Sequence, residues 1–199
     1  MIETHWHWHS AYQNNLDWQK QRRQQIIDDS SPETFLFTEH IPCITFGKRG
    51  GDLRSQTSTP VFHINRGGLA TWHGFGQLVL YPLIHIQRRR IGTRHFVQIL
   101  EEALLETILD YGVKAVRRDK CPGLWWQGKK LASIGLEIKQ GVSMHGCAIN
   151  INNSLEGFNE IVPCGFSNIE MISLSKILNI TIPLHSFGKQ WQKNLLTFF

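Results

Sequence analysis

Cys164 is a candidate for covalent chemistry. It stands between a proline and a glycine in the segment IVPCGF, residues 161–166. Pro163 restricts the backbone before the cysteine and Gly165 frees it afterwards, so we expect the thiol on a turn rather than inside a regular strand. The residue types alone allow four roles: an apolar filler, half of a disulfide, a metal ligand or a nucleophile. The chain has three other cysteines: Cys43, Cys121 and Cys147. No two of the four are spaced as C-x-x-C, which argues against a disulfide framework or a structural zinc site.

Two adjacent lysines, Lys129 and Lys130, begin the strand-like segment KKLASIGLEI. Successive strand side chains point to opposite faces, so we expect one lysine in solvent and the other toward the packed side. A lysine that faces a cleft loses solvation, which favours its neutral form and makes it a usable base for a nearby thiol. The simpler alternative is two exposed lysines at the start of a strand.

The densest polar segment is RGGLATWHGFGQ, residues 66–77. It combines four glycines with hydrogen-bonding side chains between two expected strands. Glycines let a backbone approach a ligand closely, so the segment indicates a loop that lines a binding cleft. It contains neither a P-loop nor a GxGxxG motif. A flexible hairpin loop is the alternative.

Small residues follow a histidine in SMHGCAINI, residues 143–151. A narrow apolar slot for an acyl chain would need them, and so would ordinary close strand packing.

Near the start of the chain, THWHWH alternates, which predicts an edge strand with histidines on one face and tryptophans on the other. Alternating histidines can also bind a metal, but no carboxylate or cysteine is close by, so we expect no metal site.

The elements that must position these segments mix strands with flanking helices. We expect a helix capped by Ser10 and ending near Asp28, and a second one capped by Thr93 and ended by Gly112. Two short helices should start near Ser173 and Ser186. Strands are expected at residues 34–40, 61–66, 77–86, 113–118, 123–126, 129–138 and 142–151. Because they do not alternate regularly with helices, the pattern predicts an α+β fold with a mainly antiparallel or mixed sheet, in a single domain over residues 1–199.

Composition and charge narrow the class of protein. The chain has 199 residues, 41% of them apolar and 19% charged, as in globular domains. The longest apolar stretch, residues 78–84, is too short to span a bilayer, and no secretory or transit signal is visible, so we expect a cytoplasmic protein. The net charge is +5. The cationic residues form four clusters: Arg22-Arg23, Lys48-Arg49, Arg88-Arg89-Arg90, and Arg117-Arg118 with Lys120. Such clusters suit an acidic protein partner or nucleic acid, or they form a solvated basic face.

Four segments in this order, RGG-x-x-T-x-H-G-x-G-Q, K-[IL]-A-S-[IL]-G, HG-x-A-[IL]-N and PCG, resemble the octanoyltransferase (lipoyl(octanoyl) transferase) family over about residues 10–180. The resemblance implies a fold similar to the catalytic domains of biotin and lipoate protein ligases. It also implies a cysteine/lysine acyltransferase that needs no cofactor or metal. Where the family pattern has proline, this chain has Phe75, so we expect a looser loop and an added ring that narrows or caps the cleft.

Carried over by position, Cys164 is the nucleophile and Lys130 its partner. The acyl-binding walls implied by the resemblance are Arg66, Gly67, Gly68, Leu69, Ala70, Thr71, Trp72, His73, Ser133, Ile134, Gly135, Gly146, Cys147 and Ala148. The implied donor is octanoyl-acyl carrier protein. The implied acceptors are lipoyl domains of 2-oxoacid dehydrogenase E2 subunits and the glycine cleavage H protein. We expect a monomer that binds neither nucleic acid nor membrane.

The developing oxyanion needs hydrogen-bond donors. Candidates are backbone N–H groups near Gly165 or Lys130 and the side chains of Thr71 or His73, which the sequence does not rank. Three alternative functions remain at this point. They are an ATP-dependent lipoate or biotin-type protein ligase, a non-catalytic protein that holds a lipoyl domain or an acyl chain, and a nucleic-acid binder, which only the basic clusters suggest.

Overall fold

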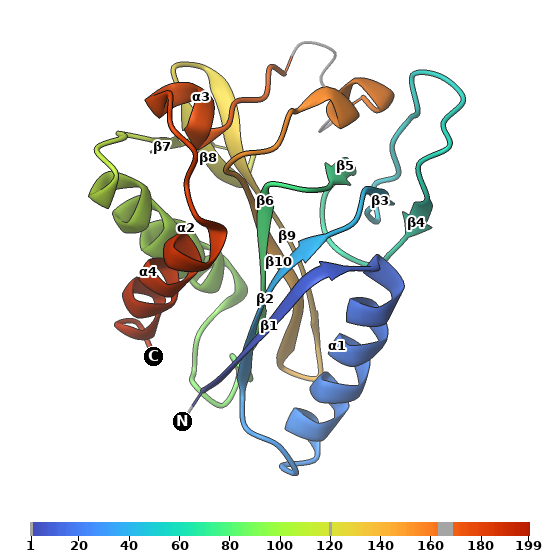
Figure 1. Cartoon of the computed structure of the whole chain (residues 1–199). Helices are drawn as coiled ribbons and strands as arrows, with labels where there is room; N and C mark the ends of the chain where they lie inside the picture. Colours follow the sequence, from blue (N-terminus) through green and yellow to red (C-terminus); the bar gives the residue numbers. More distant parts are fainter. Residues whose placement is uncertain (1, 120, 163–168) are drawn as a thin grey trace.

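A mixed seven-stranded sheet forms the centre of the protein (Figure 1). The computed structural model describes residues 2–119, 121–162 and 169–199. The strands follow the order β1-β2-β6-β10-β9-β8-β7, with β1 and β2 parallel and the other neighbours antiparallel. Their bounds are β1 Glu3–Ser10, β2 Thr34–His40, β6 Gln77–Leu83, β7 Val116–Arg117, β8 Gly123–Trp126, β9 Lys129–Lys139 and β10 Val142–Asn150. The expected α+β class with a mixed sheet is confirmed.

Helices cover both faces of this sheet (Figure 1). Helix α1 (Tyr12–Ile27) lies on one face, and α2 (Thr93–Asp110) and α4 (Leu184–Leu196) lie together on the other. The larger core fills the space between the sheet and the α2/α4 layer. Two short helical segments complete the described chain, η1 (Glu156–Glu160) and α3 (Leu174–Leu178).

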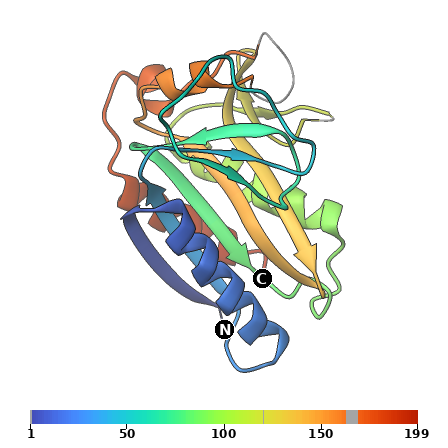
Figure 2. The same cartoon turned by 90° about the vertical axis from the view of Figure 1, so that its right-hand side faces the viewer.

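A small sheet, in the order β4-β3-β5, lies on the same side as α1 and crosses the large sheet (Figure 2). Its strands are β3 (Cys43–Phe46), β4 (Val61–His63) and β5 (Ala70–His73). Here the expectations were partly wrong. Residues 43–46 were not expected as a strand, and the loop expected over residues 66–77 contains β5. The β3–β5 pairing joins segments about 27 residues apart, so no local pattern announces it.

Helix α2 shows why the helices could be expected. Its apolar positions Phe96, Leu100, Leu104 and Ile108 recur at helical spacing and are all fully buried. The expected caps were wrong by one residue. Gly92 and Ala11 occupy the N-cap positions of α2 and α1, without side-chain cap hydrogen bonds. Thr93 is already helical, and Ser10 is the last residue of β1.

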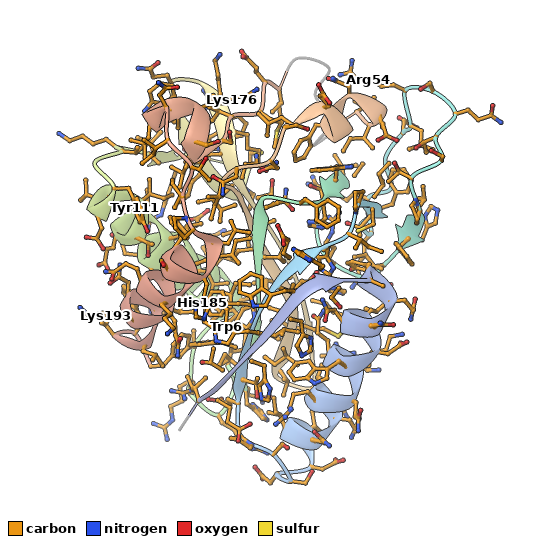
Figure 3. The ribbon with its side chains drawn as sticks, viewed as in Figure 1. Trp6, Arg54, Tyr111, Lys176, His185 and Lys193 are labelled. Atoms are coloured by element: carbon orange, nitrogen blue, oxygen red, sulfur yellow. The ribbon has the colours of Figure 1, made fainter. Side chains whose placement is uncertain are left out.

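The N-terminal strand β1 forms one edge of the sheet, as its alternation indicated. Trp6 stacks on Phe37 and makes an edge contact with His185 of α4, with ring centroids 4.7 Å apart (Figure 3). On the other face, His5 and His7 lie against Trp18 of α1. Within the described ranges, no group of three or more metal-ligating side chains gathers.

Several cationic residues pair within the chain. Arg23 binds Glu137 at 2.7 Å and Arg89 binds Glu33 at 2.5 Å. By contrast, Lys48 and Arg49 are exposed on the loop after β3, and no ion pair of theirs is found among the described residues. No described helix is both long and apolar enough to cross a membrane.

Candidate active site

A central cavity lies between the large sheet and the small sheet, with about 540 Å³ of empty space that includes a solvent-open part. Strands β9 and β10 form its floor, while β5 and the segment before β5 cover it. The cavity is lined by thirteen of the residues expected at the site: Arg66, Gly68, Leu69, Ala70, Thr71, His73, Lys130, Ser133, Ile134, Gly135, Gly146, Cys147 and Ala148. Segments from three distant parts of the sequence therefore meet at one concave surface.

Two expected wall residues lie outside this lining. The Trp72 side chain points away, into a small apolar cluster where its ring packs 5.6 Å from that of Phe158. The alternation of side chains along β5 accounts for this direction. Gly67 joins the two sheets instead, because its N–H donates to the carbonyl of Leu136 at 2.9 Å and its carbonyl accepts from Arg66 Nη1.

The two adjacent lysines have opposite environments. Lys130 is 2% exposed and lines the cavity, with its Nζ 5.3 Å from the centre of the Trp125 ring. The same Nζ also lies 3.4 Å from the Sγ of Cys121. Lys129 points outward and pairs with Glu170 at 2.5 Å. The alternation expected from the sequence is present, and Lys130 is the lysine that faces the cavity.

Cys164 lies outside the described residues. Backbone hydrogen bonds hold the described chain on both sides of its segment. Val162 donates its N–H to the carbonyl of Asp52 at 3.0 Å, and the N–H of Lys130 donates to the carbonyl of Glu170 at 2.8 Å. Cys121, which sequence reasoning left without a role, is the described thiol in contact with Lys130.

Arg66 holds the covering segment in place. Its guanidinium donates to the backbone carbonyl of Thr45 at 2.7 Å and to the hydroxyl of Thr45 at 2.9 Å. Gly135 on β9 lies directly beneath: a Cβ there would come within 2.8 Å of the carbonyl of Gly67 and 3.1 Å of Arg66. The arginine therefore ties the covering segment to β3, and Gly135 allows that segment to lie close against β9.

His73 belongs to a polar network in which each partner has a defined role. The amide nitrogen of Gln77 donates to the carbonyl of Trp72 and to Asn150 Oδ1, so Gln77 Oε1 must accept from His73 Nδ1 at 2.7 Å. Burial, reinforced by nearby His40, lowers the pKa of His73 to about 3. The imidazole is therefore neutral, carries its hydrogen on Nδ1 and can only accept at Nε2.

The small residues on β10 have different reasons to be small. Gly146 is required by strand packing, because a Cβ there would overlap the carbonyl of Leu80 on β6. Cys147 is 1% exposed within the main core, and burial raises the pKa of its thiol. Ala148 lies on the α1 side of the sheet and faces the cavity with its register partner Ser133. Both alternatives drawn from the sequence, a slot and close packing, apply to different residues.

Four residues that sequence reasoning did not assign also line the cavity: Tyr12, Val79, Tyr81 and His145. The Tyr81 hydroxyl donates to His40 Nε2 at 2.7 Å, since His40 Nδ1 donates to the carbonyl of Ser10. His145 directly precedes Gly146 in the HG-x-A segment, and that position was the one available signal. Tyr12 and Tyr81 gave none, because their expected helix and strand positions suit ordinary core aromatics.

Phe75 does not cap the cavity. Its ring is 51% exposed and packs edge-on against His9 at 5.5 Å, so the expected narrowing of the cleft was wrong. The turn is held by Glu39, whose buried carboxylate accepts from the N–H of Gly76 at 2.7 Å. This hydrogen bond fixes a turn that lacks the proline of the family pattern.

Comparisons with known proteins agree with this geometry. The model of the lipoyl protein ligase A/B catalytic domain matches residues 11–196. An octanoyltransferase of Desulfotalea psychrophila is 40% identical over an alignment 158 residues long, with 74% of this chain and 71% of that protein covered. An octanoyltransferase of Geobacter metallireducens is 41% identical over 169 residues, covering 83% of this chain and 78% of that protein.

Solved structures share the fold at low identity. The structure of P. falciparum LipL1 in complex with lipoate superposes with a TM-score of 0.77 at 16% identity, covering all of this chain and 62% of that one. Biotin protein ligase from Aquifex aeolicus gives a TM-score of 0.56 at 11% identity, covering 98% of this chain and 67% of the ligase. The expected likeness to both kinds of ligase is thus confirmed. By its family model and its curated relatives, this chain belongs to the octanoyltransferase family of the lipoyl protein ligase A/B catalytic domains.

Proposed function

We propose that the protein takes an octanoyl group from octanoyl-acyl carrier protein and delivers it to a lysine of a lipoyl domain, through a thioester on Cys164. The observation that carries the proposal is the position of Lys130. Of two adjacent lysines, it is the one buried in a cavity built from the walls that the family pattern names. Glu170, only six residues beyond Cys164 in sequence, is hydrogen-bonded to the backbone of this lysine.

In the first half-reaction, Lys130 accepts the proton of the Cys164 thiol. The thiolate attacks the carbonyl carbon of the donor thioester, the bond to the phosphopantetheine sulfur breaks, and Lys130 returns its proton to that leaving sulfur. In the second, the amine of the lipoyl lysine attacks the octanoyl-Cys164 carbonyl, and Lys130 accepts the amine proton. The bond to the Cys164 sulfur then breaks as the amide forms, and Lys130 passes the proton to that sulfur. A covalent intermediate lets one cavity serve two bulky proteins in turn.

The geometry narrows the candidates for oxyanion stabilisation. His73 cannot donate at Nε2, since its hydrogen is held by Gln77. The N–H of Lys130 already donates to the carbonyl of Glu170. Of the donors considered, the Thr71 hydroxyl in the cavity wall and the backbone near Gly165 remain.

The specific acceptor proteins, the oligomeric state and the cellular location are also proposals. We infer that E2 lipoyl domains and the glycine cleavage H protein are the acceptors, that the protein acts as a monomer of one domain, and that it works in the cytoplasm. A reducing compartment would keep the Cys164 and Cys121 thiols free. The reaction needs neither ATP nor a metal, because a thioester is already activated.

Intact-protein mass spectrometry after mixing with octanoyl-acyl carrier protein tests the proposal. We expect one octanoyl adduct on the wild type, none on Cys164→Ala, and discharge of the adduct by a lipoyl domain. Cys121→Ala is the discriminating control, because its thiol also lies beside Lys130. If the adduct were lost in Cys121→Ala and kept in Cys164→Ala, the nucleophile would be reassigned. Transfer that requires ATP and free octanoate would identify a ligase, and binding of a lipoyl domain without turnover would identify a non-catalytic protein.

A further inference from the structure

The strand next to β9 changes where β10 ends, at Asn150. Strand β10 pairs with β9 as far as Ile149, which lies opposite Ala132. Two residues nearer the start of β9, Lys130 instead pairs in parallel with residues 170–172. These residues, the flanking segment, take the place beside β9 that β10 leaves.

Two backbone hydrogen bonds join the flanking segment to Lys130. The N–H of Lys130 donates to the carbonyl of Glu170 at 2.8 Å, and the N–H of Ile172 donates to the carbonyl of Lys130 at 2.9 Å. In a longer parallel ladder, the carbonyl of Ile172 would accept from the N–H of Ala132. Ala132 is already paired with Ile149 of β10, so the ladder stops there and the carbonyl of Ile172 needs another donor.

The side-chain amide of Asn150 supplies that donor. Its Nδ2 donates to the carbonyl of Ile172 at 3.2 Å. Its Oδ1 accepts from Gln77 Nε2 and from Asn153 Nδ2, both at 3.0 Å, which fixes the direction of the amide. Asn150 is 2% exposed, so these hydrogen bonds are shielded from bulk water. The amide therefore ties the flanking segment to the end of β10.

An ion pair between Lys129 and Glu170 also joins β9 to the flanking segment, but it lies at the surface and contributes little. After the flanking segment, the N–H of Ser175 in α3 donates to the carbonyl of Ile151 at 2.9 Å. In the other direction, Cys164 is six residues before Glu170 in sequence. The flanking segment is therefore where the chain that carries this cysteine joins β9.

We propose that Asn150 is a positioning residue for acyl transfer: its amide holds the flanking segment beside Lys130. The inference rests on the proposed function, in which Lys130 takes the proton of Cys164. Proton transfer needs the two groups within hydrogen-bond reach, and a misplacement of about 1 Å costs about 10²-fold in rate. Asn150 lies outside the lining of the central cavity, so it acts through the backbone and not by contact with the acyl group.

Single-turnover formation of the octanoyl-enzyme from octanoyl-acyl carrier protein tests the inference. Asn150→Ala removes the donor to the carbonyl of Ile172. The rate at saturating donor should fall by about 10–10²-fold, since the flanking segment is no longer held against Lys130. The donor concentration that gives half of this rate should stay within about twofold of the wild-type value, because no surface that meets the donor is changed.

Asn152→Ala is the matched control. The amide of Asn152 also holds a loop, through two hydrogen bonds to the backbone of Ile182, at 2.7 and 3.0 Å. Ile182 lies just before α4 and not in the flanking segment. We expect Asn152→Ala and Asn150→Ala to lose comparable stability toward urea, because each loses a buried or half-buried amide. The octanoylation rate of Asn152→Ala should stay within about twofold of wild type.

A double-mutant cycle with Lys130→Met separates positioning from a general loss of structure. If Asn150 acts by holding the chain beside Lys130, then Asn150→Ala should slow the residual reaction of Lys130→Met by less than about threefold. A general loss of structure would lower the rate by the same factor in both backgrounds. Asn150→Ser serves if the alanine variant does not fold, because its hydroxyl stays polar but is one bond too short to replace the amide nitrogen.

Three results would overturn the inference. They are a rate of Asn150→Ala within about twofold of wild type, equal slowing in Asn150→Ala and Asn152→Ala, and an equal effect of Asn150→Ala with and without Lys130. Absence of any octanoyl adduct on the wild type would instead reject the proposed function. The failure of the inference and the failure of the proposed function are therefore distinguishable.

Discussion

Lys129 and Lys130 are neighbours in sequence, but Lys129 faces solvent and Lys130 faces the cavity. One side chain is paired with Glu170 at the surface, and the other is enclosed beside Trp125 and the Cys121 thiol. An exposed ion pair contributes little to stability or function. In the proposed mechanism, Lys130 is the base for the Cys164 thiol, and a positioned general base contributes directly to the rate. The two lysines therefore form a matched pair for testing the role of the base.

We expect Lys130→Met to slow formation of the octanoyl-enzyme by about 10²–10⁴-fold, the usual contribution of a positioned general base. Lys129→Met should stay within about twofold, since it removes only an exposed ion pair. Part of the loss in Lys130→Met should recover above about pH 8.5, where a free thiol ionises without help. Quenched-flow mass spectrometry measures these rates. Equal losses in both variants would remove Lys130 from the base role.

The role of a single side chain could be predicted from the sequence only where neighbouring residues carry the signal for it. Alternation showed that one lysine of the pair points inward, and the family pattern selected Lys130. The inward side of β5 was not predictable, so Trp72 was assigned to a wall that it does not reach. His145 was not assigned to the site at all, because its positive φ has no signature in a strand-like segment.

The loop after β3 is the element best placed to receive an acidic partner. Its backbone hydrogen-bonds the segment that covers the cavity, through Lys48 N–H to the carbonyl of Arg66 and Arg49 N–H to the carbonyl of Gly68. Both side chains are exposed. The other arginine clusters are partly neutralised by Glu33, Glu101 and Glu137. The basic charge that matters for docking should therefore lie on this loop.

We expect the double variant Lys48→Glu, Arg49→Glu to raise KM for octanoyl-acyl carrier protein by about tenfold at low salt, with a much smaller change in kcat, because charge at a rim mainly changes association. The difference from wild type should shrink as salt rises, since exposed charges are screened. Lys193→Glu is the control: Lys193 is exposed on α4, on the far side of the sheet (Figure 3). If both variants raised KM equally, docking would depend on net charge and not on the loop.

Element by element, the fold was predictable wherever a segment carries its own pattern. Helix α2 and the strands β2, β6, β9 and β10 follow from periodicity that a single window contains. Strands β3 and β5 do not, because each is short and is defined by pairing with the other across the loop and β4. The small sheet that covers the cavity was therefore the least predictable part of the architecture.

At the scale of the whole molecule, three buried histidines couple the cavity to folding stability. Burial lowers the pKa of His40 to about 4 and those of His73 and His145 to about 3. In the unfolded chain, histidine has a pKa of about 6.5. Between these values the unfolded state binds protons that the folded state does not. Stability is therefore fully present above about pH 6.5 and is lost as the pH falls toward the folded values.

Near pH 5.5, each of the three histidines should contribute a loss of about 1 kcal/mol per pH unit, because almost one proton per group is taken up on unfolding. Urea unfolding at pH 7.5, 6.5, 5.5 and 4.5 should show this dependence. His40→Gln keeps a donor for the Ser10 carbonyl and an acceptor for Tyr81, so its slope should fall by about 1 kcal/mol per pH unit while the fold persists. His95→Gln, at an exposed position on α2, should leave the slope unchanged. If His40→Gln kept the wild-type slope, His40 would not be a neutral buried group in the folded protein.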